Sequence, residues 1–259
     1  MQIGIHISPC SFRPAGSVAF TPTSIAGLQL WLDASDSSTL FTDSAGSTPA
    51  TADGDPVGRW ADKSGNSNHT LQTDGTKKPL LKVNILNGKS IIRNDGVNDF
   101  LKSTTGGADS SFTVFATNIK RGGEGFNMMA VSMGEETTGK RRCIWHPSNG
   151  NTWPNSVSFN GSSRDVQANL PWVTGTANIA QFINTSGAIQ IAKNNSAWTT
   201  STSPGIVAYT ATNIFVGSNN QMTENFNGDY AEVLVYAASL SDANRTLILD
   251  YLNSKWGVY

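Results

Sequence analysis

The carboxylates of this chain do not form the row that glycoside hydrolysis usually needs. That reaction uses two carboxyl groups roughly 5 to 9.5 Å apart. Two carboxylates at alternate positions of one strand would lie on the same face of the sheet. The sequence contains five glutamates: Glu124, Glu135, Glu136, Glu224 and Glu232. Glu135 and Glu136 are adjacent, and the residues two positions from Glu232 are Tyr230 and Leu234. We therefore expect no catalytic residues and no enzyme, with a glycoside hydrolase built from carboxylates far apart in the sequence as the minority alternative.

Nucleophilic and nucleotide chemistry have no motif here. The three histidines, His6, His69 and His146, lie in unrelated contexts, and there is no Gly-x-Ser-x-Gly elbow. No glycine-rich phosphate loop precedes a helix. His69 follows a Ser-Gly-Asn turn and is expected to be structural.

Two acidic turns offer the oxygen ligands that a hard cation such as Ca²⁺ prefers. One contains Asp53 and Asp55, and the other contains Asp95 and Asp99. The first lacks the bidentate glutamate of an EF-hand, because Ser64 stands at position twelve. The first is typical of a solvated turn with Gly54 at a positive φ, and the second of a tight turn held by Asx hydrogen bonds. No Cys/His spacing suits zinc. The sequence predicts no cofactor, with calcium at these aspartates as the alternative.

The strongest candidate for a ligand surface is a loop between two tryptophans, Trp145 and Trp153, which contains Asn149 and Asn151. Indole rings stack on the apolar faces of sugars, and asparagine amides supply donors and acceptors for hydroxyl groups. Arg164 follows in the sequence and could contact an acidic glycan. The alternative is that one or both tryptophans fill the core, since large aromatic side chains are usually well buried.

The other tryptophans divide into two groups. Trp172 and Trp198 lie next to turns and are secondary ligand candidates, whereas Trp31, Trp60 and Trp256 are assigned to packing.

Composition excludes several classes of protein. Charged residues make up 14% of the chain and the net charge is −1, so no broad field favours nucleic acid or an anionic membrane. No apolar run approaches the roughly 20 residues that span a bilayer, and the first ten residues lack the features of a secretory signal. Two cysteines, Cys10 and Cys143, do not make a disulfide framework. We expect unpaired thiols, with a bond between the two as the alternative.

Strand patterns dominate from residue 27 onward and predict an all-β protein. The expected strands cover 28–32, 111–120, 178–184, 188–193, 213–217 and 230–236. One helix is expected near the C-terminus, with Ser241 as its N-cap and Gly257 at its stop. Ile248, Leu252 and Trp256 recur at four-residue spacing, which predicts a helix docked on the sheets.

Residues 1–24 are predicted to form an extended arm, separate from a domain at 25–259. Prolines in the arm exclude a continuous helix, and Ile3, Ile5 and Ile7 alternate with polar residues as in a strand. One interpretation is an edge strand of the domain's own sheet. The other is an assembly arm, including Phe12, that adds a strand to a partner.

Three segments in order resemble the concanavalin A-like lectin/glucanase superfamily, in its laminin-G-like branch. The first runs from Gly27 to Ala34 and continues with Trp60-Ala61-Asp62-Lys63-Ser64-Gly65-Asn66. The second, residues 92–101, is similar to the family's F-D-G-x-N-D-Y-L element. The third runs from Phe226 to Tyr236 and leads into the final helix. Glycanases of the superfamily carry Glu-x-Asp-x-Glu along one strand, which this sequence does not match.

The resemblance implies a two-sheet antiparallel jelly-roll sandwich. Similar domains are frequent in phage virion proteins and bacterial surface proteins, which suggests a non-catalytic protein of a virion surface: a capsid decoration, head-fibre or tail-associated protein. The partners then expected are other virion proteins, bound through the arm, and glycans. A homo-oligomer made in the host cytoplasm is expected, with no nucleic acid or membrane insertion. The alternatives are a bacterial carbohydrate-binding adhesin and a polysaccharide depolymerase.

Overall fold

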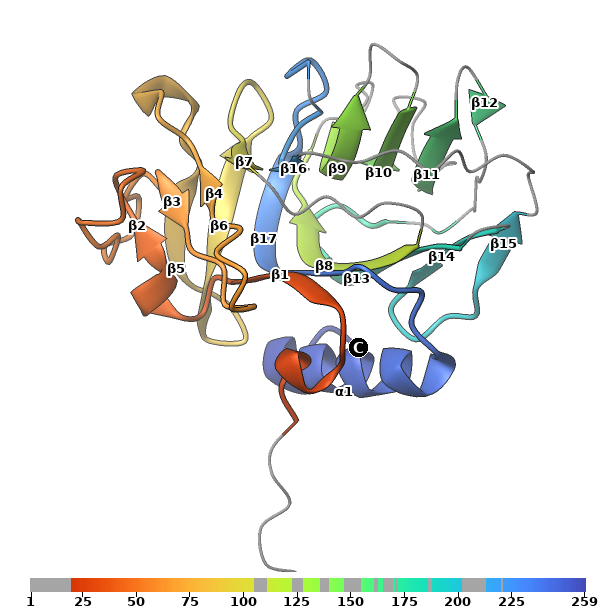
Figure 1. Cartoon of the computed structure of the whole chain (residues 1–259). Helices are drawn as coiled ribbons and strands as arrows, with labels where there is room; N and C mark the ends of the chain where they lie inside the picture. Colours follow the sequence, from red (N-terminus) through yellow and green to blue (C-terminus); the bar gives the residue numbers. More distant parts are fainter. Residues whose placement is uncertain are drawn as a thin grey trace, which may run out of the picture.

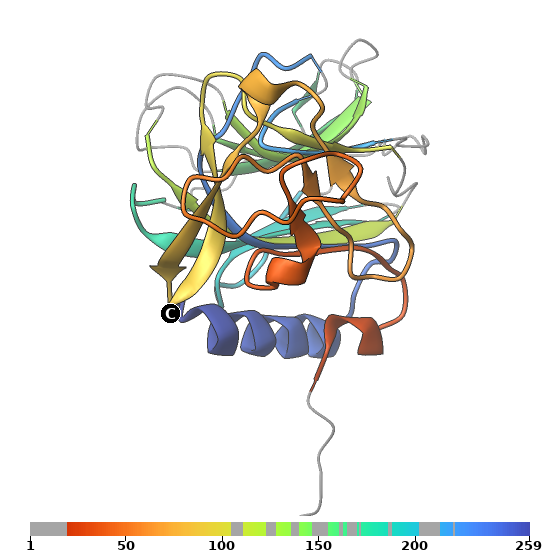
Figure 2. The same ribbon diagram turned by 90° about the vertical axis from the view of Figure 1, so that its left-hand side faces the viewer.

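The chain is built as three stacked layers, two β-sheets and one α-helix (Figures 1 and 2). The computed structural model describes residues 20–104, 111–122, 128–135, 140–146, 155–160, 163–164, 170, 172–185, 188–201, 213–219 and 221–259. Within these ranges, no helix is long and apolar enough to cross a membrane.

The first sheet, called sheet A, has eight strands and lies between the other two layers (Figure 1). Its strands follow the order β15-β14-β13-β8-β17-β6-β5, and β1 also pairs with β17. All of its pairings are antiparallel. The bounds are β1 Leu28–Asp33, β5 Leu80–Leu86, β6 Lys89–Asp95, β8 Phe112–Lys120, β13 Ala177–Asn184, β14 Ile189–Lys193, β15 Thr199–Ser201 and β17 Asn227–Tyr236.

The second sheet, called sheet B, has nine strands in the order β12-β11-β10-β9-β16-β7-β4-β3-β2. These are β2 Leu40–Phe41, β3 Arg59–Trp60, β4 Thr70–Leu71, β7 Leu101–Ser103, β9 Met128–Glu135, β10 Lys140–His146, β11 Asn155–Asn160, β12 Ser163–Arg164 and β16 Ile214–Val216. Short 3₁₀ turns occur at η1 Pro22–Ser24, η2 Ser37–Thr39 and η3 Gly75–Lys77.

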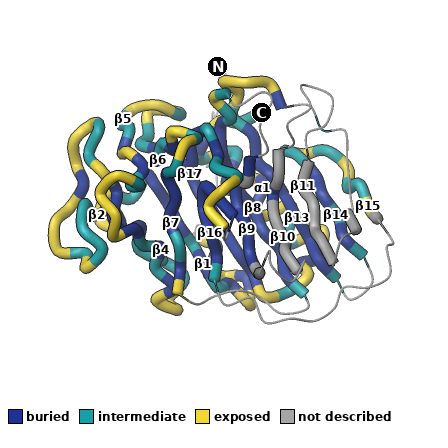
Figure 3. Tube along the Cα trace, turned by 90° about the horizontal axis from the view of Figure 1, so that it is seen from above, coloured by how far each residue is buried: buried dark blue, intermediate teal, exposed yellow. Residues whose placement is uncertain are grey.

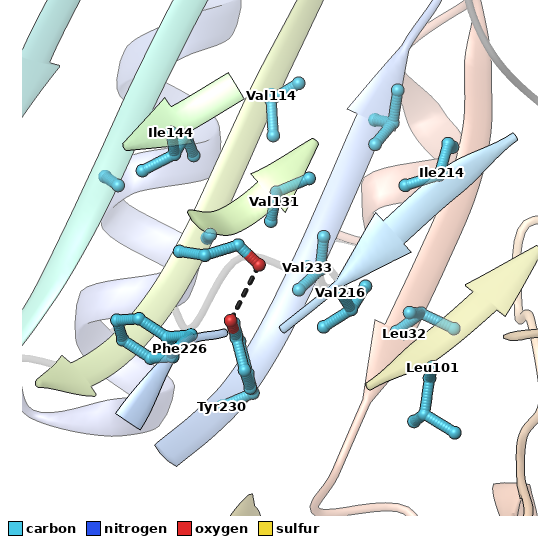
Figure 4. Close-up of a cluster of buried hydrophobic side chains, with 14 of the residues drawn as sticks. Leu32, Leu101, Val114, Val131, Ile144, Ile214, Val216, Phe226, Tyr230 and Val233 are labelled. Carbon is cyan, nitrogen blue, oxygen red and sulfur yellow. Dashed lines mark hydrogen bonds between the residues drawn. The ribbon is translucent and has the colours of Figure 1, made fainter. Parts of the chain in front are cut away.

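The main hydrophobic core lies between the two sheets (Figure 4). Successive strand residues point to opposite faces, so Leu32 of β1 and Val233 of β17 meet Leu101 and Val216 of sheet B. The hydroxyl of Tyr230 is buried in this core and donates to the Ala130 carbonyl at 2.6 Å. That bond satisfies the one polar atom of the Tyr230 side chain.

A second core lies between sheet A and the helix α1, which covers Asp242–Trp256. Ile248, Leu252 and Trp256 are buried on its sheet-facing side, as their spacing predicts. The Ser241 side chain caps the first turn by accepting from the Asn244 amide, and Gly257 ends the helix in a left-handed conformation. Both helix ends are therefore those expected from the sequence.

The remaining predicted elements are also found. β1, β8, β13, β14, β16 and β17 coincide with the six expected strands, and β8 is buried on both faces. The two-sheet antiparallel sandwich is confirmed.

The N-terminal segment can be followed from Phe20. Its ring contacts Tyr251 of α1 at 5.8 Å between centroids, and the Tyr236 hydroxyl donates to the Pro22 carbonyl at 3.0 Å. Residues 20–22 thus pack against the domain. The arm residues Ile3, Ile5, Ile7 and Phe12, and also Cys10, lie outside the described residues.

Substituting Gly228 is expected to destabilise the sandwich. A Cβ at this position would lie 2.2 Å from the Phe226 ring and 2.5 Å from the Ile119 carbonyl oxygen. Overpacking of this kind typically costs about 1–3 kcal/mol, so Gly228→Ala should lower the urea midpoint accordingly. Gly75→Ala is the matched control because nothing lies within 4 Å of its Cβ. Equal midpoints for the two variants would contradict the packing described for β17.

Candidate functional site

The Trp-x-Asp-x-Ser-Gly-Asn loop that resembles the superfamily motif is used to hold strand β1. Asp62 accepts from the Trp31 amide at 2.9 Å and from the amides of Ser64 and Asn68. The Asn66 side chain donates to the Leu28 carbonyl at 2.8 Å. These bonds satisfy backbone groups of β1 on the edge that does not pair with β17. The motif is therefore structural.

His69 belongs to the same arrangement. Its Nδ1 accepts from the Asp62 amide at 3.0 Å, which requires the neutral tautomer with the proton on Nε2. Burial, and next the positive charge of Arg59, lower the pKa of His69. The structural role expected for His69 is therefore confirmed.

The two carboxylates of the first acidic turn accept hydrogen bonds from protein donors. Asp53 forms an ion pair with Lys82 and accepts from the Val83 amide at 3.1 Å. Asp55 accepts from the amides of Thr51 and Ala52, both at 2.8 Å.

The second acidic turn is closed by hydrogen bonds in the same way. Asp95 accepts from the amides of Val97 and Asn98, and Asp99 accepts from the Asp95 amide at 3.0 Å. Burial, followed by the negative charge of Asp95, raises the pKa of Asp99 to about 6. No group of three or more metal-ligating side chains is found among the described residues.

A buried carboxylate, Glu232, collects four hydrogen bonds beneath helix α1. It accepts from the indole nitrogens of Trp31 and Trp256, both at 2.7 Å, from the Tyr251 hydroxyl at 2.8 Å and from the Lys255 ammonium at 2.7 Å. All four partners donate, so the geometry holds the ionised carboxylate. Glu232 therefore has a structural role.

The orientation of Glu232 comes from a bulge in β17. The register with β8 shifts between Tyr230 and Glu232, which adds Ala231 to the strand. Ala231 consequently packs in the core beneath the helix, on the same side of the sheet as Glu232. A regular strand would have placed Glu232 on the face of Tyr230, in the central core.

Asp33 and Glu232 form a carboxylate pair across β1 and β17, joined by Lys255. The Lys255 ammonium lies 2.7 Å from each. Burial disfavours the charged form of both carboxyl groups. Lys255, Ser35 and Lys63 together overcome this for Asp33 and lower its pKa. For Glu232 burial is the larger effect, and its pKa is raised. Both carboxylates are almost fully buried under α1, so this pair cannot reach a polysaccharide from solvent.

The predicted tryptophan loop begins where β10 ends. Trp145 is paired with Met129 of β9 in the backbone register, and Arg164 is paired with Phe159 of β11. Asn149, Asn151 and Trp153 lie outside the described residues. Cys143 lies in β10, paired with Ser132.

The two secondary tryptophans are engaged by the protein itself. Trp172 belongs to the central core. Trp198 donates to Asp242 at 3.1 Å, and the Arg245 guanidinium stacks 4.2 Å from its ring centroid. Trp60 and Trp256 are fully buried, as expected, while Trp31 is half-buried.

A row of directly opposed residues crosses the outer face of sheet B, the face away from the central core. Each member is the register partner of the next, and directly opposed residues share a face. Their inward neighbours Trp60, Leu101 and Ile214 belong to the core, so the row points outward. The outer row consists of Phe41, Arg59, Leu71, Lys102, Phe215 and Ser132.

The outer row alternates cations with apolar groups. The Arg59 guanidinium lies 5.9 Å from the Phe41 ring centroid, and the Lys102 ammonium lies 5.2 Å from that of Phe215. Phe100 packs on Phe215 with 6.2 Å between ring centroids. In Figure 3, which looks down on this sheet, β7 and β16 are largely buried at the centre of the face.

Sequence reasoning did not identify the outer row. Three of its strands, β2, β3 and β4, are only two residues long, so none shows a measurable alternation. β7, Leu101–Ser103, has one apolar residue and shows no alternation in its sequence either.

The solved structures similar to this chain include glycoside hydrolases. An arabinofuranosidase in complex with arabinofuranosyl-α-1,2-xylobiose superposes with a TM-score of 0.58 at 13% identity, over 78% of this chain and 51% of that chain. A sialidase from Trypanosoma rangeli superposes with a TM-score of 0.56 at 10% identity, over 89% of this chain and 33% of that chain. No family model and no curated protein matches the sequence. This chain thus spans about half and one third of these two chains.

These comparisons confirm a β-sandwich of the jelly-roll, lectin-like type. They also correct the function inferred from the resemblance. The neighbours point to carbohydrate-active enzymes instead of a non-catalytic virion protein, and they offer no support for a phage, virion or capsid role. At this level of identity the likeness itself establishes the fold alone.

Replacing Glu232 by glutamine is expected to weaken the docking of α1. The amide would present N–H groups where four donors converge, and Lys255 would lose one of its two carboxylate partners. Breaking a buried ion pair typically costs about 3–5 kcal/mol. We expect a loss near the lower end of this range in chemical denaturation. Asp36→Asn, which removes a half-exposed partner of Lys63, should cost less than about 1 kcal/mol; a comparable loss would argue against the central role of Glu232.

Asp99 should make the protein less stable as the pH rises. Its pKa is about 6 in the folded state against 3.8 ordinarily, so the folded chain binds the proton more tightly. Stability is therefore highest when Asp99 is protonated and falls between about pH 4 and pH 6. Asp99→Asn should be more stable than the parent at pH 8, by about 1 kcal/mol, and no more stable at pH 4.

The control for this effect is Asp55→Asn. Backbone amides of Ala52 and Thr51 lower the pKa of Asp55, so its charged form is the one that the fold favours. This variant should lose stability at pH 8 relative to pH 4. Thermal denaturation at both pH values tests the pair, and equal effects of Asp99→Asn at the two values would contradict the assignment.

Proposed function

We propose that this chain is a carbohydrate-binding domain of a carbohydrate-active enzyme, which holds an oligosaccharide across the outer face of sheet B. The observation that carries the proposal is the outer row. It places the aromatic and aliphatic side chains of Phe41 and Leu71 in one line with the nitrogen donors of Arg59 and Lys102, whereas Phe215 and Ser132 at the far end of the row are buried. Sugars need both, because their rings have apolar C–H faces and their hydroxyl groups need hydrogen-bond partners.

The layer order supports the choice of face. Helix α1 packs on sheet A, on the side away from sheet B (Figures 1 and 2). The outer face of sheet A is therefore closed by a hydrophobic interface. The outer face of sheet B carries the half-buried side chains of Phe41, Leu71 and Lys102.

The similar structures support a carbohydrate ligand. The arabinofuranosidase was solved with a substituted xylobiose, and the sialidase with sialic acid. A shared fold does not by itself transfer an activity, so these ligands indicate the class of molecule to test.

Glycoside hydrolysis is the second candidate, favoured by the activities of the similar structures. It would need two carboxyl groups that a polysaccharide can reach. The described members of the outer row include no carboxylate, and Asp33 and Glu232 lie under α1. Binding is therefore better supported than catalysis by the described residues.

A charged substitution in the outer row should abolish binding. Leu71→Glu places a carboxylate in the middle of the row, between Arg59 and Lys102. We expect its affinity for a bound oligosaccharide to fall at least about tenfold, because a desolvated charge faces the ligand. Isothermal titration with arabinoxylan, arabinan and acidic oligosaccharides measures this. Ile85→Glu, at an exposed position of β5, is the control and should bind normally.

The same mixtures also test the alternatives. Release of reducing sugar would establish hydrolysis. Loss of binding in Trp153→Ala, with binding retained in Leu71→Glu, would assign the ligand to the predicted tryptophan loop instead of sheet B. The absence of binding to every glycan would overturn the proposed function.

A further inference from the structure

We infer that the ligand held by sheet B is an acidic polysaccharide, whose carboxylates pair with Lys102 and Arg59. This inference rests on the proposed function and names the class of sugar. The outer row contains two cations, and none of its described members is an acid. A neutral sugar would leave both cations without a counter-charge on an apolar surface.

Lys102 lies at the centre of the outer row. It is directly opposite Leu71 on one side and Phe215 on the other. Its ammonium lies over the Phe215 ring, so the face of the ring's π-system attracts its charge without neutralising it. A carboxylate approaching from outside would meet an ammonium already positioned by its neighbours, and charge-assisted hydrogen bonds of this kind are the stronger ones.

Arg59 lies two strands away, on the other side of Leu71. Its Nη1 donates to the Ala45 carbonyl at 2.8 Å, which fixes the guanidinium, while its Nε is buried without a hydrogen-bond partner. Two cations fixed on one face suit a ligand that carries more than one acid group.

Several basic residues on the sheet A side are paired with carboxylates. Arg93 pairs with Asp229, Lys82 with Asp53, and Lys255 with Asp33 and Glu232. Neither Arg59 nor Lys102 has an ion-pair partner among the described residues. Arg59 and Lys102 thus carry positive charge without an ion pair where the ligand is proposed to bind, and Lys89 of β6, which also has no ion pair among the described residues, provides a comparison on the other sheet.

The spacing of the two cations fits a polymer. They are separated by strand β4, and adjacent strands lie about 4.8 Å apart, so their backbones are about 9.6 Å apart. A polysaccharide lying across the strands presents a carboxylate on each acidic unit. One polysaccharide molecule can therefore contact both cations while its sugar rings lie over Leu71.

The test compares polygalacturonate with its methyl ester, which has the same sugar backbone without the negative charges. Titration calorimetry should show binding of polygalacturonate that weakens as salt is added, and much weaker binding of the ester. Lys102→Gln should lower the affinity for polygalacturonate about tenfold. Lys89→Gln removes the same charge from β6 in sheet A and is the matched control, with unchanged affinity expected.

The outcomes are distinguishable. Equal binding of polygalacturonate, its ester and neutral arabinan, unaffected by Lys102→Gln, would overturn the acidic specificity and leave the proposed function standing. Equal losses in Lys102→Gln and Lys89→Gln would also overturn it, because only total charge would then matter. Failure of all glycans to bind would overturn both proposals. Thermal denaturation of each variant confirms that the compared proteins are folded.

Discussion

The carboxylate of Glu232 is the constraint on which the layered structure depends. A buried charge is costly unless hydrogen bonds satisfy it, and here the donors come from both β1 and α1. Because one acceptor serves both elements, the strand and the helix have one mutual position that satisfies it. The bulge at Ala231 turns this carboxylate toward the helix, so a local irregularity of β17 determines how two layers meet.

The elements predicted from the sequence are those governed by local rules. Strand alternation located β1, β8 and β17, and capping residues located the ends of α1. The partners of Glu232 could not be predicted in this way, since Trp31 is 201 residues away in the sequence. Contacts at such separations depend on the topology and on the bulge, which no periodicity reveals.

The candidate site shows the same division. The acidic turns and the tryptophan loop were noticed because their residues are neighbours in the chain. In the structure, Asp55 and Asp95 of these turns accept hydrogen bonds from backbone amides of the same turns. The outer row is assembled from strands spread between residues 40 and 216, so only the sheet register brings its members together. The prediction of a virion function was wrong for another reason. It was carried over from a resemblance that concerns only the fold.

The placement of the chain ends has a further consequence for how the domain is tethered. Phe20 and the end of α1 both lie in the helix layer, beneath sheet A (Figure 1). A segment that continues from Phe20 or from the end of α1 therefore starts on the side of the domain opposite the outer row. Such a tether would orient the face of sheet B away from its attachment point. A domain anchored on this side would meet a polymer with its cationic face foremost.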